Sequence, residues 1–173
     1  SPLKALHEML GEPAKTCFYG QLIAIQLAAL KQVEPGSVAP DFKGATLNGD
    51  TLSLHGIKAR VKLLDFWASW CEPCRRETPN VRKIYQKYHD KGLEIIGVSL
   101  DEKKQEWAKA MKNKITWPNI SDLKGKNSEI AARYFIRGIP HTILLDEDNH
   151  IVAKNLRGKA LEKKIAELLE ENK

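Results

Sequence analysis

A continuous apolar run, interrupted only by Lys62 and Asp65, occupies residues 61–67. A run of this length is typical of a strand buried on both faces of a sheet. A second such run occupies residues 93–100. We therefore predict two central strands. The carboxylate of Asp65 is notable there, because a buried charge is costly unless it is compensated.

The segments around these strands alternate between helical and extended patterns. Helices are expected at residues 74–89, 102–111, 128–135 and 159–170, and an antiparallel strand pair at residues 141–146 and 151–155. Such alternation implies a central sheet covered by helices on both faces. The fold class is therefore α/β.

A β-hairpin is expected ahead of this core. Residues 41–46 and 51–54 flank the turn Asn48-Gly49-Asp50, and Asn-Gly readily adopts the positive φ angles that tight hairpin turns need. We expect this hairpin to form an edge of the sheet.

The length of 173 residues suits one α/β domain with a modest appendage. Apolar residues recur at helical spacing in residues 3–10 and 16–33, and the Pro- and Gly-containing segment 34–37 separates them from the rest. We predict a helical appendage over residues 1–36 and a domain over residues 37–173.

Charge and hydropathy exclude several classes of protein. The net charge of +6 is spread over Lys-rich helices, which indicates a solvated basic surface, so no nucleic-acid partner is expected. The apolar stretch 18–30 contains Gln21 and Gln26 and is shorter than the ~20 residues of a membrane span. The first residues lack a signal-peptide pattern, which indicates either a cytosolic protein or a trimmed chain.

The chemistry is expected at Trp70-Cys71-Glu72-Pro73-Cys74, where a buried strand meets a helix. Helix N-terminal N–H groups stabilise a thiolate at Cys71, and Cys74 is spaced to resolve a mixed disulfide formed there. A zinc site is the alternative, but it needs four ligands, and the sequence offers no second Cys pair. We expect no metal and no cofactor.

The segment 64–74, together with Gly138-Ile139-Pro140, resembles the thioredoxins. The segment 38–42, Glu72, Glu77 and the long connection 101–138 resemble, more narrowly, the extracytoplasmic thiol:disulfide reductases of the TlpA/ResA type. This resemblance covers most of the chain, about residues 37–170. It implies a thioredoxin-like fold with a central mixed β-sheet flanked by helices, and it identifies residues 1–36 as the remnant of an N-terminal domain.

The resemblance also implies roles for individual residues. Cys71 becomes the attacking thiolate, Cys74 the resolving thiol, and Asp65 a buried acid of raised pKa that exchanges protons with Cys74. Glu77 matches a further acidic residue of this group of reductases. The residues expected to contact substrate are Trp70, Glu72, Pro73, Ile139 and the cis-proline Pro140.

Simpler interpretations stay open for several of these residues. Asp65 is alternatively a surface residue at a strand end, and Glu77 a partner of Arg75 or Arg76 on an exposed helical turn. We expect Trp67 in the core, with Trp70 shielding the disulfide. Two further residues are interpreted structurally: Cys17 as a small buried hydrophobe, and His141, where thioredoxins usually have Thr, as part of a strand.

The leading function is reduction of disulfides in partner proteins, with electrons supplied by a membrane-bound or soluble thiol donor. Oxidation or isomerisation uses the same exchange, and only the reduction potential separates the directions. A peroxiredoxin-type peroxidase is suggested by residues 39–42, but such enzymes have Thr three residues before the nucleophile, where this chain has Ala68. The non-enzymatic alternative is a binding module with a closed structural disulfide.

The resemblance further implies a periplasmic or other extracytoplasmic location, with membrane anchoring in the full-length protein and a role in cytochrome c biogenesis. Weak dimerisation is also expected, through the apolar face around Leu22, Ile25 and Leu30.

Overall fold

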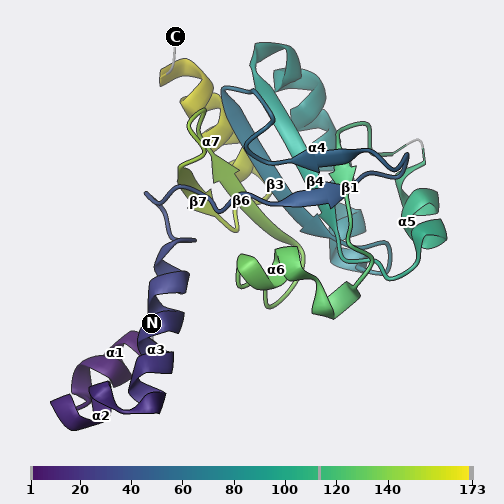
Figure 1. Ribbon diagram of the computed structural model, residues 1–173. Helices are drawn as coiled ribbons and strands as arrows, with labels where there is room; N and C mark the ends of the chain where they lie inside the picture. Colours follow the sequence, from purple (N-terminus) through teal and green to yellow (C-terminus); the bar gives the residue numbers. More distant parts are fainter. Residues whose placement is uncertain (1, 113, 172–173) are drawn as a thin grey trace.

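The computed structural model describes residues 2–112 and 114–171. Its centre is a mixed β-sheet with the strand order β5-β4-β3-β6-β7 (Figure 1). The strands are β3 (Val61–Trp67), β4 (Leu93–Ser99), β5 (Asn119–Ile120), β6 (His141–Leu145) and β7 (Ile151–Lys154). β3, β4 and β5 run parallel, whereas β6 is antiparallel to both β3 and β7. The predicted central mixed sheet is confirmed.

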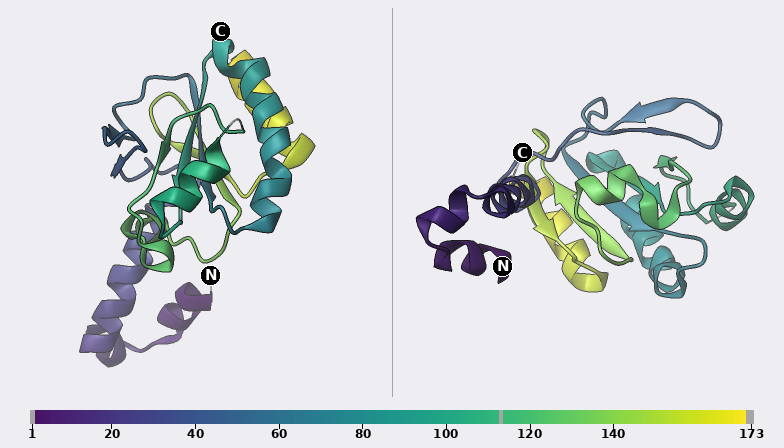
Figure 2. Two further views of the ribbon diagram at one scale, coloured as in Figure 1. Left: turned by 90° about the vertical axis from the view of Figure 1, so that its right-hand side faces the viewer. Right: turned by 60° about the horizontal axis from the view of Figure 1, so that its bottom comes forward.

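Helices α4 (Glu72–Tyr88) and α7 (Gly158–Glu171) cover one face of this sheet. They lie side by side in Figure 2, where Val81 and Ile84 of α4 share an apolar cluster with Leu161 and Ile165 of α7. These side chains recur at helical spacing and bury one face of each helix. Full burial of such a side chain contributes about 1.5–3 kcal/mol, so this packing fixes the position of α4 on the sheet.

The opposite face is covered by α6 (Glu129–Arg133) and the segments around the N-terminal hairpin. Tyr134, immediately after α6, packs against Phe66 of β3 and Phe42, and its hydroxyl donates to the carbonyl oxygen of Pro40. Helix α5 (Lys104–Met111) follows β4 and buries Trp107. Both faces of β3 are therefore shielded from water, as its apolar sequence predicts.

The hairpin itself consists of β1 (Lys43–Ala45) and β2 (Thr51–Ser53), with Gly49 in the turn at φ +92°. The expectation that it forms an edge of the central sheet is wrong, because β1 and β2 make a separate two-stranded sheet. A bridge between Ala45 and Ser121 connects the hairpin to the segment after β5. The hairpin therefore packs over a face of the core, where Leu52 and Leu54 join the apolar cluster.

Lys62 is a charged residue in the buried strand β3, and hydrogen bonds compensate its charge. Its ammonium group donates hydrogen bonds of 2.9 Å to the carbonyl oxygen of Glu147 and to Oδ1 of Asn149. Burial is the main cause of its lowered pKa, with Lys58 as the second cause. Lys62 thus fastens the turn between β6 and β7 to the end of β3.

The N-terminal segment forms α1 (Pro2–Met9), α2 (Glu12–Thr16) and α3 (Phe18–Lys31), which extend from the sheet-containing body (Figures 1 and 2). Contact with the body begins at Val33, which is buried, and continues at Gly36, whose N–H donates to the carbonyl oxygen of Ile151. None of the helices formed by residues 2–112 and 114–171 is long and apolar enough to cross a bilayer.

Cys17 separates α2 from α3, so the expected helix at residues 16–33 is interrupted there. The interpretation of Cys17 as a buried hydrophobe is wrong, because the residue is an exposed free thiol that donates to the carbonyl oxygen of Ala14. Phe18, Tyr19 and Ile25 of α3 are also exposed.

Candidate active site

Cys71 and Cys74 form a disulfide with an S–S distance of 2.04 Å at the N-terminus of α4. Cys71 is the N-cap residue of this helix, and its Sγ atom accepts the N–H of Cys74 at 3.2 Å. In the reduced protein the same N–H group and the positive end of the helix dipole stabilise a thiolate at Cys71. Cys71 thus lies at the strand-to-helix junction that the sequence motif predicts.

Both cysteines are largely covered, with exposed fractions of 5% for Cys71 and 4% for Cys74. Trp70 beside them is 66% exposed, so its ring forms part of the surface next to the cysteines. Glu72 and Pro73 are exposed between the two cysteines. The two cysteines are therefore covered, while the residues between them face solvent.

Charged residues lie within the motif and directly after it. Arg76 forms an exposed ion pair with Glu72, with a nitrogen–oxygen distance of 3.3 Å, and such pairs contribute little energy. Arg75 is exposed as well, and its backbone N–H donates to the carbonyl oxygen of Cys71. The backbone of α4, rather than the guanidinium of Arg76, is the direct polar environment of Cys71.

Asp65 lies in β3, in register with Thr142 of β6 and Gly97 of β4. Its side chain is densely surrounded by protein and keeps only part of its surface accessible. The pKa of Asp65 is raised to about 7, first by burial and then by the negative charge of Glu77, while the positive charge of Arg157 opposes the rise. A carboxyl group with this pKa can both accept and return a proton near neutral pH.

Glu77 does not pair with Arg75 or Arg76 among the described contacts. Its Oε1 atom instead accepts hydrogen bonds from Asn80 Nδ2 at 2.8 Å and from the backbone N–H of Gly158 at 2.9 Å. Because Gly158 begins α7, the half-buried carboxylate of Glu77 satisfies an N–H at the start of that helix. Glu77 thereby joins α4 to α7 and places a negative charge near Asp65.

Pro140 follows a cis peptide bond after Ile139 and leads directly into β6. The carbonyl oxygen of Pro140 accepts a hydrogen bond from Nη2 of Arg157. Arg157 therefore contacts the cis-proline segment and also acts on the charge of Asp65. Sequence reasoning missed this residue, since its only local signal is a basic side chain immediately before the last predicted helix.

Asp101 is a second missed residue. It is buried, and its carboxylate accepts hydrogen bonds from the N–H and hydroxyl of Ser69 and from the hydroxyl of Ser99. Ser69 precedes Cys71 by two residues, so Asp101 holds the loop between β3 and the cysteines in place. The available signal is the segment Ser99-Leu100-Asp101 at the end of the second buried run, where polar groups commonly collect.

The sequence matches the AhpC/TSA family over residues 35–154. The chain belongs to the AhpC/TSA family. Its sequence is 37% identical to the thioredoxin-like protein YneN of Bacillus subtilis over 119 residues, which span 66% of this chain and 67% of YneN. It is 31% identical to thiol-disulfide oxidoreductase ResA of Bacillus cereus over 125 residues, 72% of the chain and 70% of ResA.

A solved structure agrees with these sequence matches. The thioredoxin domain of a thiol-disulfide oxidoreductase from Bacteroides vulgatus aligns with a TM-score of 0.74 and 39% identity, covering 79% of this chain and 98% of that one. The predicted resemblance to thioredoxin-like proteins is confirmed. This member of the AhpC/TSA family is an enzyme, a thiol-disulfide oxidoreductase.

His141 is a departure from the thioredoxin pattern in this AhpC/TSA-family chain. Its ring is edge-on to Phe66, and its buried Nε2 atom has no hydrogen-bond partner among the described residues. The pKa of His141 is lowered, first by burial and then by the positive charges of Lys154 and Arg157. Both effects favour the neutral form of the imidazole. His141 is the first residue of β6, which agrees with its interpretation as a strand residue.

Proposed function

We propose that this thiol-disulfide oxidoreductase works as a reductase of protein disulfides. The observation that carries the proposal is the acid in β3: Asp65, with a pKa raised to about 7, lies in the strand that leads to Cys71 and Cys74. A resolving thiol needs a base that is poised near neutral pH when the mixed disulfide is broken. The resemblance of Glu72 and Glu77 to the TlpA/ResA-type reductases supports this direction of electron flow.

In the proposed reaction, the thiolate of Cys71 attacks one sulfur of the partner disulfide, which releases the other sulfur as a thiolate. Asp65 then accepts the proton of Cys74, and the Cys74 thiolate attacks the Sγ atom of Cys71 in the mixed disulfide. The second partner sulfur leaves, and the Cys71–Cys74 disulfide forms. Two electrons pass to the partner, and a thiol donor restores the dithiol by the reverse exchange.

The remaining predicted site residues are proposed to position the partner. An extended segment of substrate pairs with the backbone beside Ile139 and Pro140, where Arg157 fixes the carbonyl oxygen of Pro140. The exposed side chains of Trp70, Glu72 and Pro73 form the border that the segment crosses. Glu77 is proposed to act on Asp65 through its charge.

Peroxide reduction has less support in this active site. In a peroxiredoxin a Thr hydroxyl three residues before the nucleophile assists catalysis, and here Ala68 occupies that position and is fully buried. Because the chain matches the AhpC/TSA family, peroxide consumption is measured as well. Rapid consumption that requires Cys71 and not Cys74 would favour a peroxidase function.

The cellular setting is likewise proposed from the resemblance to extracytoplasmic reductases. We place the protein on the periplasmic or other extracytoplasmic side of a membrane, anchored in its full-length form, with residues 1–36 as the remnant of an N-terminal domain. Weak dimerisation through α3 is supported by the exposure of Leu22 and Ile25. Sedimentation that shows a monomer at every concentration would refute the dimer.

The direction of electron flow is tested by the reduction potential. The protein is equilibrated with defined thiol/disulfide buffers, and the redox state is followed by Trp67 and Trp70 fluorescence. A potential near or below about −270 mV, the value of thioredoxin, is expected, whereas one near about −120 mV would make the protein an oxidant. A Cys71→Ser variant serves as the control and should show no redox-dependent change.

A further inference from the structure

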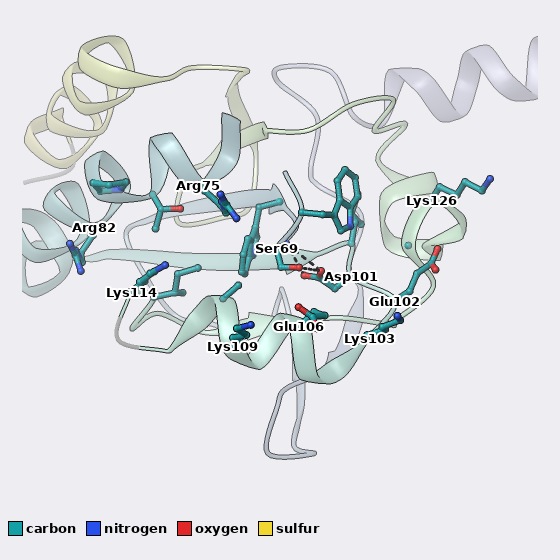
Figure 3. A pocket seen from close by; sticks show the side chains of 18 residues that line it. Ser69, Arg75, Arg82, Asp101, Glu102, Lys103, Glu106, Lys109, Lys114 and Lys126 are labelled. Carbon is teal, nitrogen blue, oxygen red and sulfur yellow. Dashed lines mark hydrogen bonds between the residues drawn. The ribbon is translucent and has the colours of Figure 1, made fainter. Parts of the chain in front are cut away.

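A groove of about 1010 Å³ opens beside the redox motif. It runs between α4 and α5 (Figure 3), and Ser69 and Trp70, the two residues before Cys71, are part of its lining. Apolar side chains line its interior, including Leu100, Ala110 and Ile115. Its volume matches the upper part of the range found for ligand pockets, which is enough for several residues of an extended polypeptide.

The rim of this groove is rich in basic side chains. Figure 3 shows Arg75 and Arg82 on α4, with Lys109 and Lys114 on the α5 side of the same end. Two further lysines stand at the other end, and the six together define what we call the basic groove: Arg75, Arg82, Lys103, Lys109, Lys114 and Lys126.

Acidic residues in the same lining are fewer. Glu102 and Glu106 lie toward the end that holds Lys103, while Asp101 is buried and its carboxylate is engaged by Ser69 and Ser99. The end formed by α4 and the C-terminal part of α5 therefore carries a concentrated positive charge.

Some lysines elsewhere in the protein have their charge compensated by a neighbouring carboxylate. Lys87 and Lys124 form ion pairs with Glu162 and Glu129. By contrast, within residues 2–112 and 114–171 no ion pair involves Lys109 or Lys114. Arg75, Lys103 and Lys126 are likewise unpaired in that part of the chain. Their charges are thus available to an incoming partner.

We propose that the basic groove binds an acidic segment of the partner polypeptide that also carries apolar residues and that flanks the cysteine reacting with Cys71. The proposal rests on the proposed exchange of protein disulfides. Trp70 directly precedes Cys71, is 66% exposed and lines the groove, so a chain whose cysteine is bonded to Cys71 enters the groove where it passes Trp70. Apolar side chains then meet the interior, while carboxylates meet the two basic walls.

The groove lining does not include Ile139 or Pro140, so the proposed contact is additional to backbone pairing at the cis-proline. Backbone pairing does not depend on the charge of the partner's side chains, whereas the basic groove favours partners with acidic side chains. Specificity for acidic partners thus arises from α4 and α5, while the exchange chemistry stays at the motif.

The test uses three short peptides, each with one cysteine held in a mixed disulfide with the same small thiol. Their flanks alternate Leu with Asp, Asn or Lys. The rate constant for exchange with the reduced protein is measured at low salt. An exposed ion pair changes an equilibrium constant by roughly 1.5- to 5-fold, so two or more pairs predict that the Asp peptide reacts about tenfold faster than the Asn peptide. The advantage should shrink at 0.5 M salt, where the Debye length is below about 8 Å.

The variant Lys109→Gln/Lys114→Gln removes two charges from one wall and should lower the Asp-to-Asn rate ratio about fivefold. The matched control, Lys83→Gln/Lys159→Gln, removes the same charge from exposed positions outside the groove and should keep the wild-type ratio. Equal rates for all three peptides, or equal losses in the two variants, would overturn the proposal.

A small neutral disulfide and a competing polyanion complete the experiment. If the wild-type protein reacts with the small neutral disulfide but its peptide rates do not depend on the flank charge, only the proposed binding in the basic groove is refuted. If it does not react with the small neutral disulfide, the proposed function is refuted as well. A single-stranded oligonucleotide is added as a competitor of the Asp peptide. Competition at equal charge concentration would mean that the groove binds polyanions in general, and the proposal would fail.

Discussion

Replacing Asp65 by Asn is expected to stabilise the oxidised protein, and to do so only when the pH is high. The Asn side chain has nearly the shape of Asp but cannot ionise. In the folded protein the carboxyl of Asp65 has a pKa of about 7 because of burial and the charge of Glu77. In the unfolded chain it ionises near its ordinary value of 3.8. The native state therefore holds the proton over a pH range in which the unfolded state has already released it.

The sign and size of the effect follow from this difference. Below pH 3.8 both states are protonated and the residue contributes nothing. As the pH rises toward 7, the unfolded state alone ionises, so the free energy of unfolding falls, and above pH 7 the loss is complete. At 1.36 kcal/mol per tenfold change in ionisation constant, the loss is about 4 kcal/mol. Because the side chain keeps part of its surface in contact with solvent, this loss is smaller, and we expect the free energy of unfolding to fall by about 2–4 kcal/mol.

Urea unfolding of the wild type and of Asp65→Asn at pH 4 and pH 8.5 measures the effect. The stability of the variant relative to the wild type should increase by about 2–4 kcal/mol between the two pH values. Comparing the two pH values cancels any change in packing that is independent of charge. The control Asp148→Asn removes an exposed carboxylate and should shift the difference by less than about 0.5 kcal/mol. A relative stability of Asp65→Asn that is the same at both pH values would refute the assignment of a buried, protonated acid.

Further predictions concern the neighbours of this acid and the support of the motif. Glu77→Gln should move the midpoint of the pH-dependent loss of stability to lower pH, because a negative charge that raises the pKa of Asp65 is removed. Arg157→Gln should move this midpoint to higher pH, because a positive charge that lowers the same pKa is removed. Unfolding measured as a function of pH tests both variants, and unmoved midpoints would contradict the two predictions. Gly97→Ala should destabilise by about 1–3 kcal/mol, since its Cβ would lie 2.1 Å from Oδ1 of Asn119, and urea unfolding checks this. Asp101→Ala should cost at least about 2 kcal/mol in the same assay, because it deprives Ser69 of its hydrogen bonds; a smaller loss would show that the loop is held by other contacts.

Local patterns in the sequence were sufficient to predict the central strands and most helices. The run at residues 61–67 coincides with β3, because a strand buried on both faces leaves an uninterrupted apolar signature. The predicted helix at residues 74–89 begins two residues later than α4 does. Pro73 and the N-cap Cys71 mark the earlier start, and the preference of Pro for the first turn of a helix gives a signal that could have found it.

Other elements leave no comparable signature. β5 contains only Asn119 and Ile120, too few residues for any periodicity, and it is defined by pairing with β4. Gly97 makes room there for Asn119, whose Oδ1 atom accepts the indole N–H of Trp67 at 2.8 Å. This arrangement joins three separated segments, so single-sequence patterns cannot reveal it.

The candidate site shows the same division between local and tertiary information. The redox pair is visible in the sequence because Cys71 and Cys74 are close along the chain and lie at a helix start. The pKa of Asp65, by contrast, depends on burial by the whole sheet, on Glu77 from α4 and on Arg157 from the segment before α7. Glu77 also binds the N–H at the start of α7, so docking of α7 on α4 brings both charges to the acid together. Any change that loosens this docking should therefore alter the proton affinity of Asp65 without touching the cysteines, which makes the contact between the two helices part of the redox site.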